Sequence, residues 1–242
     1  IIGTADIRGQ MTTIVSFDKW MGNKVLDDEQ YELLIIASYG NKRFAIVVKS
    51  VEQITTIEPN DMTDNSSDND KASFITKMNI AGQERLCTIF DGDKMLMDIY
   101  EDIEGSSNAA LNNIDSEISS KKTVLFADDS KFVREMVNGL FDKLHLNYKI
   151  YPDGKDLIDG LEKMNPDDVG LIITDIEMPK MGGREVIEHI RQKTLLDSIN
   201  IIVHTNMSNN LMSNELLKSG SSKIIGKIDL DELSSGIKEF IR

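Results

Sequence analysis

Polar side chains follow four short apolar runs in the second half of the chain. They are Asp128 and Asp129 after VLFA, Asp175 after LIIT, Thr205 after IIVH and Lys227 after KIIG. Runs of this kind are typical of buried strands, and the carboxyl ends of strands in an open parallel α/β sheet meet at one crevice. We therefore expect these five side chains to share a pocket.

The chemistry of such a pocket follows from its charges. Three carboxylates repel one another unless a cation lies among them, and all-oxygen ligation favours Mg²⁺, so Asp128, Asp129 and Asp175 are the candidate metal ligands. Asp175 could attack phosphorus as a carboxylate nucleophile. The Thr205 hydroxyl, the Lys227 ammonium group and Mg²⁺ would neutralise charge on the transferring phosphoryl oxygens.

The elements that must position this pocket alternate between strands and helices. The first helix, begun by Asp129 or Ser130 as a cap, has apolar residues at the 3.6-residue period: Phe132, Val133, Met136, Val137, Leu140, Phe141 and Leu144. Further helices are expected over Lys155–Met164, Gly183–Gln192, Asn209–Ser219 and Asp231–Ile241. This order predicts a five-stranded parallel sheet with helices on both faces and the acids at its switch point.

Residues 122–242 resemble the receiver domain of two-component signalling, in both the order of these residues and the MPKMGG turn at Met178 to Gly183. The resemblance implies a flavodoxin-like fold in which Asp175 accepts phosphate from a histidine kinase. The alternative is a doubly wound domain with coincidental acids. Haloacid-dehalogenase-like phosphatases are excluded by order, because their nucleophile precedes the acidic pair and their second catalytic Asp corresponds to Glu177 here.

Four positions bear on how closely the chain follows the receiver pattern. Glu177, two residues after the nucleophile, could modulate hydrolysis. Asn206 replaces a small residue and would crowd the pocket, and Ile224 stands where the family often has an aromatic residue that reports phosphorylation. Ile228 replaces a cis-proline. Since a cis bond before any other residue costs about 3–4 kcal/mol, we expect a trans bond and a shifted loop there.

The first part of the chain is rich in β-branched and apolar residues. Strands are expected over Thr12–Phe17, Tyr31–Ser38, Phe44–Val51, Leu86–Phe90 and Met95–Ile99. Gly40-Asn41, Gly82 and Asp91-Gly92 supply turns, and the last of these suits a type I′ hairpin. Short strands with such turns predict a mostly-β barrel or sandwich.

Three segments here resemble CheW-like coupling domains: IIGTADIRGQMTTIVSFDKWMG from Ile1, YELLIIASYGNKRFAIVVKSVEQITTI, and IAGQERLCTIFDGDKMLMDI. The resemblance implies binding to chemoreceptors and the histidine kinase CheA, with Arg8 of the Arg-Gly-Gln motif as a candidate partner-binding residue. The alternative is that this motif is merely a turn before a strand. A coupling domain joined to a receiver is the layout of CheV-type proteins, and early barrel strands are expected to be missing here.

These resemblances divide the chain into a coupling domain at 1–104, a linker at 105–121 and a receiver at 122–242. Asn60–Asp70 is polar and rich in Asp, so we expect a solvated loop. The linker has Leu111, Ile114 and Ile118 at helical spacing, which would suit a short amphipathic helix.

The composition of the chain disfavours several classes of function. A formal charge of −14 disfavours nucleic-acid binding, which needs clustered Lys and Arg. Cys87 is the single cysteine and suits a core position, and the three histidines lack metal spacing. No apolar run is long enough to cross a membrane and no secretory signal is visible, so we expect a cytoplasmic protein without membrane insertion, associated with receptor arrays.

We therefore expect an adaptor, not an enzyme acting on external substrates, whose contacts with receptors and CheA are tuned by phosphorylation of Asp175. A phosphate sink that drains phosphoryl groups from CheA is the alternative, and a Mg²⁺-dependent aspartyl-phosphate phosphatase is a third and weaker one.

Overall fold

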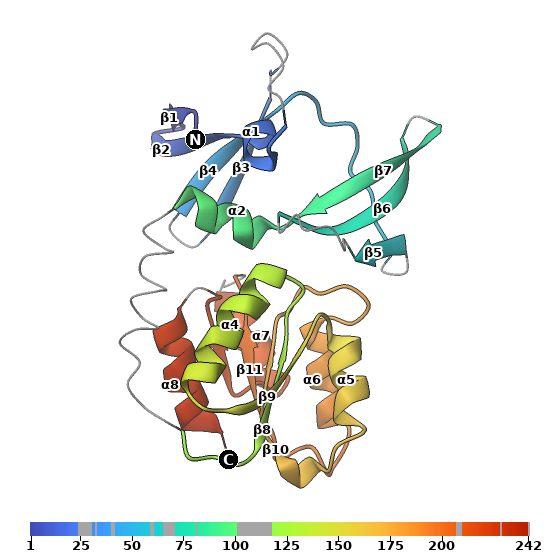
Figure 1. Ribbon diagram of the computed structural model, residues 1–242, viewed down its shortest axis with the longest axis vertical. Coiled ribbons are helices and arrows are strands. Elements are labelled where there is room, and N and C mark those ends of the chain that lie inside the picture. Colours follow the sequence, from blue (N-terminus) through green and yellow to red (C-terminus); the bar gives the residue numbers. More distant parts are fainter. Residues whose placement is uncertain are drawn as a thin grey trace. The chain divides into compact units, whose positions relative to one another are not determined.

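The computed structural model divides into two compact units, residues 1–99 and 100–242 (Figure 1). The residues that it describes are 1–23, 31, 33–39, 42–58, 61–64, 71–80, 82–100, 118–206, 210–227 and 229–241. No helix in this described part is both long and apolar enough to cross a bilayer.

The second unit is built on one parallel sheet. Its strands are β8 (Thr123–Ala127), β9 (Asn147–Tyr151), β10 (Val169–Thr174), β11 (Asn200–His204) and β12 (Lys223–Ile225). They lie in the order β12-β11-β10-β8-β9, and every pairing between them is parallel. The predicted five-stranded parallel sheet is confirmed. Chain order reverses between β8 and β10, which creates a switch point there.

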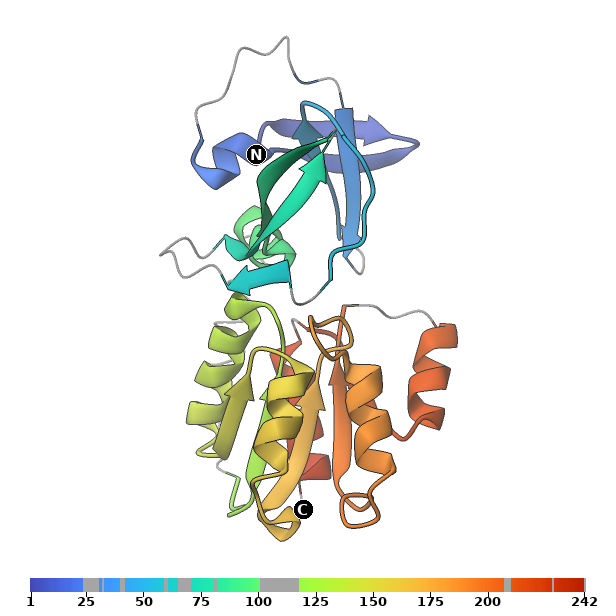
Figure 2. The same cartoon turned by 90° about the vertical axis from the view of Figure 1, so that its right-hand side faces the viewer.

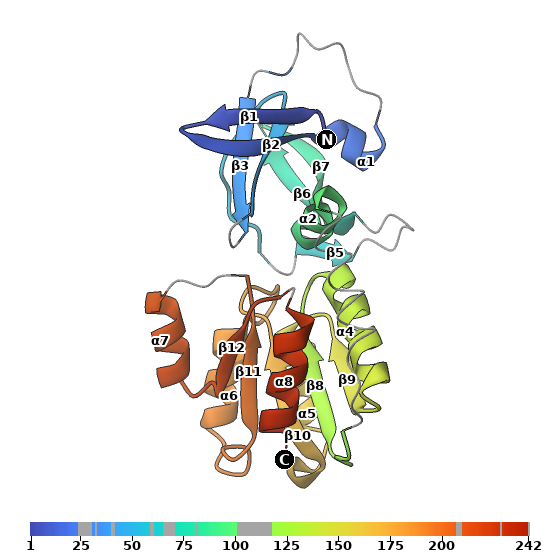
Figure 3. The same cartoon turned by 90° about the vertical axis from the view of Figure 1, so that its left-hand side faces the viewer.

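Helices cover both faces of this sheet (Figures 2 and 3). They are α4 (Lys131–Lys143), α5 (Gly154–Leu161), α6 (Gly183–Arg191), α7 (Asn210–Lys218) and α8 (Leu230–Phe240), with a 3₁₀ turn at Pro166–Asp168. Val124 and Phe126 of β8 pack with α4 and α8, whereas Leu125 and Ala127 pack with α5 and α6. This alternation is the two-residue period of a strand buried on both faces.

The first unit is mostly β, as predicted, and its described strands form two sheets. The first sheet has the order β1-β2-β4-β3 and contains β1 (Gly3–Ile7), β2 (Gln10–Ser16), β3 (Leu33–Tyr39) and β4 (Lys42–Val48). The second has the order β5-β6-β7 and contains β5 (Met62–Asp64), β6 (Ala72–Ile80) and β7 (Gln83–Phe90). Arg8 and Gly9 turn the chain between β1 and β2 with φ values of 56° and 77°.

An aromatic cluster lies beside the short helix α1 (Phe17–Met21). The ring of Phe90, at the end of β7, lies 5.2 Å from that of Phe17 and 6.0 Å from that of Trp20. The indole N–H of Trp20 donates to Asp98 Oδ2 at 2.9 Å, so the buried ring also satisfies its polar atom.

The prediction of a strand at Met95–Ile99 was wrong, because residues Gly92–Ile99 form helix α2. Asp91 is not part of a hairpin turn: its Oδ1 accepts a hydrogen bond from Lys94 N at 3.0 Å, as an N-cap does. The helix buries Met95, Leu96, Met97 and Ile99. Methionine and leucine are good helix formers, and this apolar run was too short to distinguish a helix from a strand by its period.

Two further expectations concern connecting segments. Within Asn60–Asp70, residues Met62–Asp64 form β5 and pair with β6, so this part of the expected loop is a strand. Most of the predicted amphipathic helix in Gly105–Lys121 lies outside the described residues, and residues 118–121 form no helix. Cys87 lies in β7 and is half-buried.

Candidate functional site

The three predicted acids lie together at the carboxyl edge of the parallel sheet. Asp128 follows β8 and Asp175 follows the adjacent strand β10, at the switch point. One carboxylate oxygen from each of Asp128, Asp129 and Asp175 lies within 4.8 Å of the other two. Asp128 is 0% exposed and Asp175 is 3% exposed, whereas Asp129 is half-buried. Two of the three negative charges are therefore withdrawn from water.

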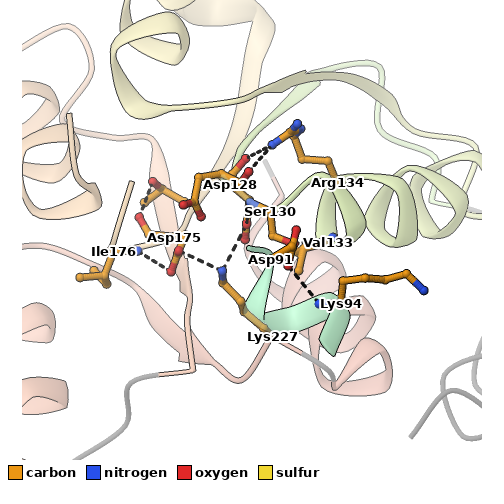
Figure 4. Close-up of polar contacts among 11 residues, drawn as sticks. Asp91, Lys94, Asp128, Ser130, Val133, Arg134, Asp175, Ile176 and Lys227 are labelled. Atoms are coloured by element: carbon orange, nitrogen blue, oxygen red, sulfur yellow. Dashed lines mark hydrogen bonds and ion pairs between the residues drawn. The ribbon is translucent and has the colours of Figure 1, made fainter. Parts of the chain in front are cut away.

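Lys227 lies between the two buried acids (Figure 4). Its Nζ is 3.2 Å from Asp128 Oδ1 and 3.0 Å from Asp175 Oδ2, and the side chain is itself buried. A buried ammonium group is stable only when it is paired, and the two carboxylates provide that pairing. Lys227 supplies one positive charge to a cluster of three carboxylates, which can attract a further cation.

The backbone around Asp175 fixes the direction of its side chain. The Ile176 N–H donates to Asp175 Oδ1 at 2.7 Å, and the Asp175 N–H donates to the Ala127 carbonyl on β8 at 2.9 Å. With Lys227 at the second oxygen, each oxygen of the Asp175 carboxylate has a defined partner. A carboxylate fixed in one orientation is better placed to attack an electrophile than a mobile one.

Two residues that sequence reasoning did not assign to the site hold the acidic loop. Asp128 Oδ1 accepts from Ser130 N at 2.9 Å, and Ser130 Oγ accepts from Val133 N at 3.2 Å, which makes Ser130 the cap of α4. Arg134 Nη1 donates to the carbonyls of Asp128 and Asp129 at 2.7 and 2.9 Å. Arg134 is one turn after the cap, but its target was not evident from sequence, since surface arginines commonly occupy such positions.

Thr205 directly follows β11, and its N–H donates to the Ile225 carbonyl of β12 at 2.9 Å. Its side chain is buried and lines a cavity between α7 and β12 together with Ile224. Thr205 is thus at the carboxyl edge of the sheet, and β11 lies next to β10, the strand that Asp175 follows.

The candidate modulating residues differ in their surroundings. Glu177 is exposed, Asn206 is half-buried, and Ile224 is half-buried against the core on the α5 and α6 side. Ile228, with its expected trans bond, lies outside the described residues. Arg8 is exposed in the first unit, in the turn between β1 and β2.

His204, the residue before Thr205, is fully buried. Its ring lies 5.8 Å from that of Phe126 in an edge-on arrangement. Burial, together with the positive charge of Lys227, lowers the pKa of His204 from 6.5 to about 3, so the imidazole is neutral at ordinary pH. Sequence spacing excluded a metal role for this histidine but did not indicate its electrostatic link to the pocket.

Comparison with known proteins gives matches over both units. Residues 1–99 match the CheW-like domain, and residues 124–238 match the response regulator receiver domain. The relatives include three proteins of Helicobacter pylori. Chemotaxis protein CheV2 is 27% identical over 224 residues, which cover 86% of this chain and 70% of that protein. Chemotaxis protein CheV1 is 32% identical over 65% of this chain and 49% of that protein. Chemotaxis protein CheV3 is 25% identical over 100% of this chain and 80% of that protein.

Proposed function

Because the chain is a CheV-type protein, with a CheW-like domain followed by a response regulator receiver domain, we propose that it is a chemotaxis adaptor controlled by phosphorylation of Asp175. In this proposal the CheW-like domain, residues 1–104, couples chemoreceptors to the histidine kinase CheA at receptor arrays. Arg8 contributes to that partner surface. Residues 105–121 link the domain to the receiver, residues 122–242, which adjusts the coupling.

The contacts of Asp175 carry the proposal. This buried carboxylate lies at the switch point of a parallel sheet, with Lys227 3.0 Å from one oxygen and the Ile176 N–H 2.7 Å from the other. Asp128 holds the same ammonium group in place, at 3.2 Å. An oriented carboxylate beside a buried cation is suited to accept a phosphoryl group, because the cation stabilises the charge that develops on the phosphoryl oxygens.

The proposed reaction has two steps. An oxygen of Asp175 attacks the phosphorus of a phosphohistidine on the kinase, a P–O bond forms, the P–N bond breaks, and the imidazole leaves with the electron pair. Water later attacks the same phosphorus, which breaks the bond to Asp175 and releases the carboxylate and inorganic phosphate. Throughout, Lys227 and the Thr205 hydroxyl would contact the phosphoryl oxygens, and Asn206 and Glu177 would border the pocket.

The residues present also fit a divalent cation. Asp128, Asp129 and Asp175 offer clustered carboxylate oxygens and no softer ligand, a donor set that suits Mg²⁺. When bound, Mg²⁺ would neutralise negative charge between the carboxylates and the incoming phosphoryl group. The backbone contacts of Arg134 keep the loop that carries two of these ligands in place before any ion binds.

Asp175→Asn tests the assignment of the nucleophile. We expect this variant to lose phosphorylation by acetyl phosphate, measured by intact-protein mass spectrometry, while keeping the fold, because Asn and Asp have nearly the same shape. Asp159→Asn is the matched control, since Asp159 is partly exposed on α5 and pairs only with Lys155 among the ion pairs of the described residues. Undiminished phosphorylation of Asp175→Asn would refute the assignment and make Asp129 the next candidate.

A further inference from the structure

The loop between β10 and α6 carries an ion pair that the proposed reaction does not use. Lys180, in this loop, has a φ of 62°. This left-handed backbone conformation is unfavourable for residues other than glycine, asparagine and aspartate. Its Nζ lies 2.6 Å from Asp153 Oδ2 and 3.6 Å from Asp156 Oδ2. The strained residue is therefore held by charge.

Asp153 is an unusual partner because it is only 2% exposed. Its Oδ1 accepts from the Asp156 N–H at 2.9 Å and so begins α5, which leaves Oδ2 for Lys180. A buried carboxylate that loses its cation is costly, whereas an exposed pair contributes little. Lys155 and Asp159, farther along the same helix, form such an exposed pair at 2.5 Å.

The backbone of the loop also lies directly against α5. The Gly154 N–H donates to the Met181 carbonyl at 3.2 Å. A Cβ placed on Gly154 would lie 2.5 Å from that same carbonyl oxygen, so only glycine permits this contact. The ion pair and this hydrogen bond together fix the middle of the loop to the beginning of α5.

The two ends of the loop meet at the nucleophile. The Gly183 N–H donates to the Ile176 carbonyl at 3.0 Å, and a Cβ on Gly183 would lie 2.1 Å from the Asp175 carbonyl oxygen. The Ile176 N–H in turn orients Asp175 Oδ1. We therefore expect a shift in the middle of this closed loop to move the Ile176 peptide group, which orients the carboxylate.

We infer that Lys180 and Asp153 are positioning residues for phosphorylation of Asp175, acting through the loop and not by contact with the phosphoryl group. The inference rests on the proposed function, because it requires Asp175 to be the nucleophile. The test reaction is phosphoryl transfer from acetyl phosphate: an oxygen of Asp175 bonds to phosphorus as the bond to acetate breaks, and acetate leaves as the carboxylate.

The variants are chosen to remove the ion pair and little else. Lys180→Asn retains a residue that tolerates positive φ, and Asp153→Asn retains a good helix cap. Each is expected to lower the rate constant of phosphorylation at saturating Mg²⁺ at least about threefold. The double variant should be no slower than Lys180→Asn, because that change alone already removes the ion pair with Asp153. Lys180→Arg keeps the charge and should stay within about twofold of the parent.

Amide hydrogen exchange in the metal-free protein provides a second readout. The Gly154 and Gly183 N–H groups should exchange faster in Lys180→Asn than in the parent, and Lys155→Asn, the matched control on α5, should change neither exchange nor rate. Unchanged phosphorylation in both single variants, or an equal loss in Lys155→Asn, would overturn the inference while leaving the nucleophile assigned. A parent chain that is not phosphorylated at all would overturn the proposed function and this inference with it.

Discussion

At the scale of single residues, the three acids of the pocket differ in their burial and in their contacts. Asp128 is fully buried and accepts from both Ser130 N and Lys227 Nζ, and Asp175 is held by Lys227 and Ile176 N. Asp129 is half-buried. Arg134 contacts its backbone carbonyl, and this hydrogen bond can still form when the side chain is replaced. Because it is the least buried of the three acids, Asp129 is the one whose replacement should disturb the fold least.

Asp129→Ala should therefore match or exceed the metal-free stability of the parent, because it relieves repulsion and because Ser130, not Asp129, caps α4. The same variant should lose the stabilisation that Mg²⁺ gives the parent. Urea unfolding with and without Mg²⁺ measures both effects. Asp128→Ala is the contrasting variant, expected to be destabilised without metal. A loss of more than about 1 kcal/mol in metal-free Asp129→Ala would show that its side chain is mainly structural.

His204 gives the protein a defined response to acid. In the unfolded chain this histidine binds a proton below its ordinary pKa of 6.5, whereas in the fold it stays neutral down to about pH 3. The unfolded state therefore takes up the extra proton, and stability falls as pH drops through that window. Relative to His204→Leu, the parent should lose about 2 kcal/mol more between pH 7 and pH 5. Identical pH profiles from chemical denaturation would exclude a neutral buried imidazole.

At the scale of elements, the turn from β10 into α6 is defined by how closely it approaches the nucleophile. A Cβ on Gly183 would meet the Asp175 carbonyl oxygen at 2.1 Å, and a backbone atom cannot move aside cheaply. Gly139, exposed on α4, has nothing within 4 Å of the same added atom. Replacement by alanine should therefore have opposite effects on stability at Gly183 and at Gly139.

Gly183→Ala should lower the free energy of unfolding by at least about 2 kcal/mol, because it overpacks backbone against backbone. Gly139→Ala should raise it by about 0.5–1 kcal/mol, because alanine loses less conformational entropy in a helix. Urea unfolding of both variants provides the comparison. Similar effects of the two substitutions would mean that the turn does not close on Asp175 as described.

The elements also show which features could be predicted from sequence. The strands of the receiver were evident because Asp128, Asp175, Thr205 and Lys227 each follow an apolar run, and its first helix was evident from an apolar period of 3.6 residues. The structure brings the four polar residues to one edge of the sheet. Helix α2 was mistaken for a strand because its apolar run is short. Arg134, His204 and the Lys180 ion pair were missed, since their significance depends on partners brought close only by folding.

At the scale of the whole molecule, the chain joins a CheW-like domain to a receiver and carries a formal charge of −14. The negative charge disfavours a nucleic-acid output, so signal output is expected through proteins. For phosphorylation to control the coupling domain, it must favour one state of the protein over another, and it can shift that equilibrium only by its differential free energy for the two states.

The most direct measurement of this control is the affinity of the chain for membrane-bound receptor and CheA assemblies, determined by co-sedimentation with and without beryllofluoride, which mimics the phosphoryl group. Asp175→Asn, tested in parallel, should not respond. We predict that beryllofluoride changes the affinity of the parent at least about fivefold, equivalent to about 1 kcal/mol of coupling. Equal affinity in both conditions, together with efficient phosphorylation of Asp175, would contradict the adaptor account and favour a phosphate sink.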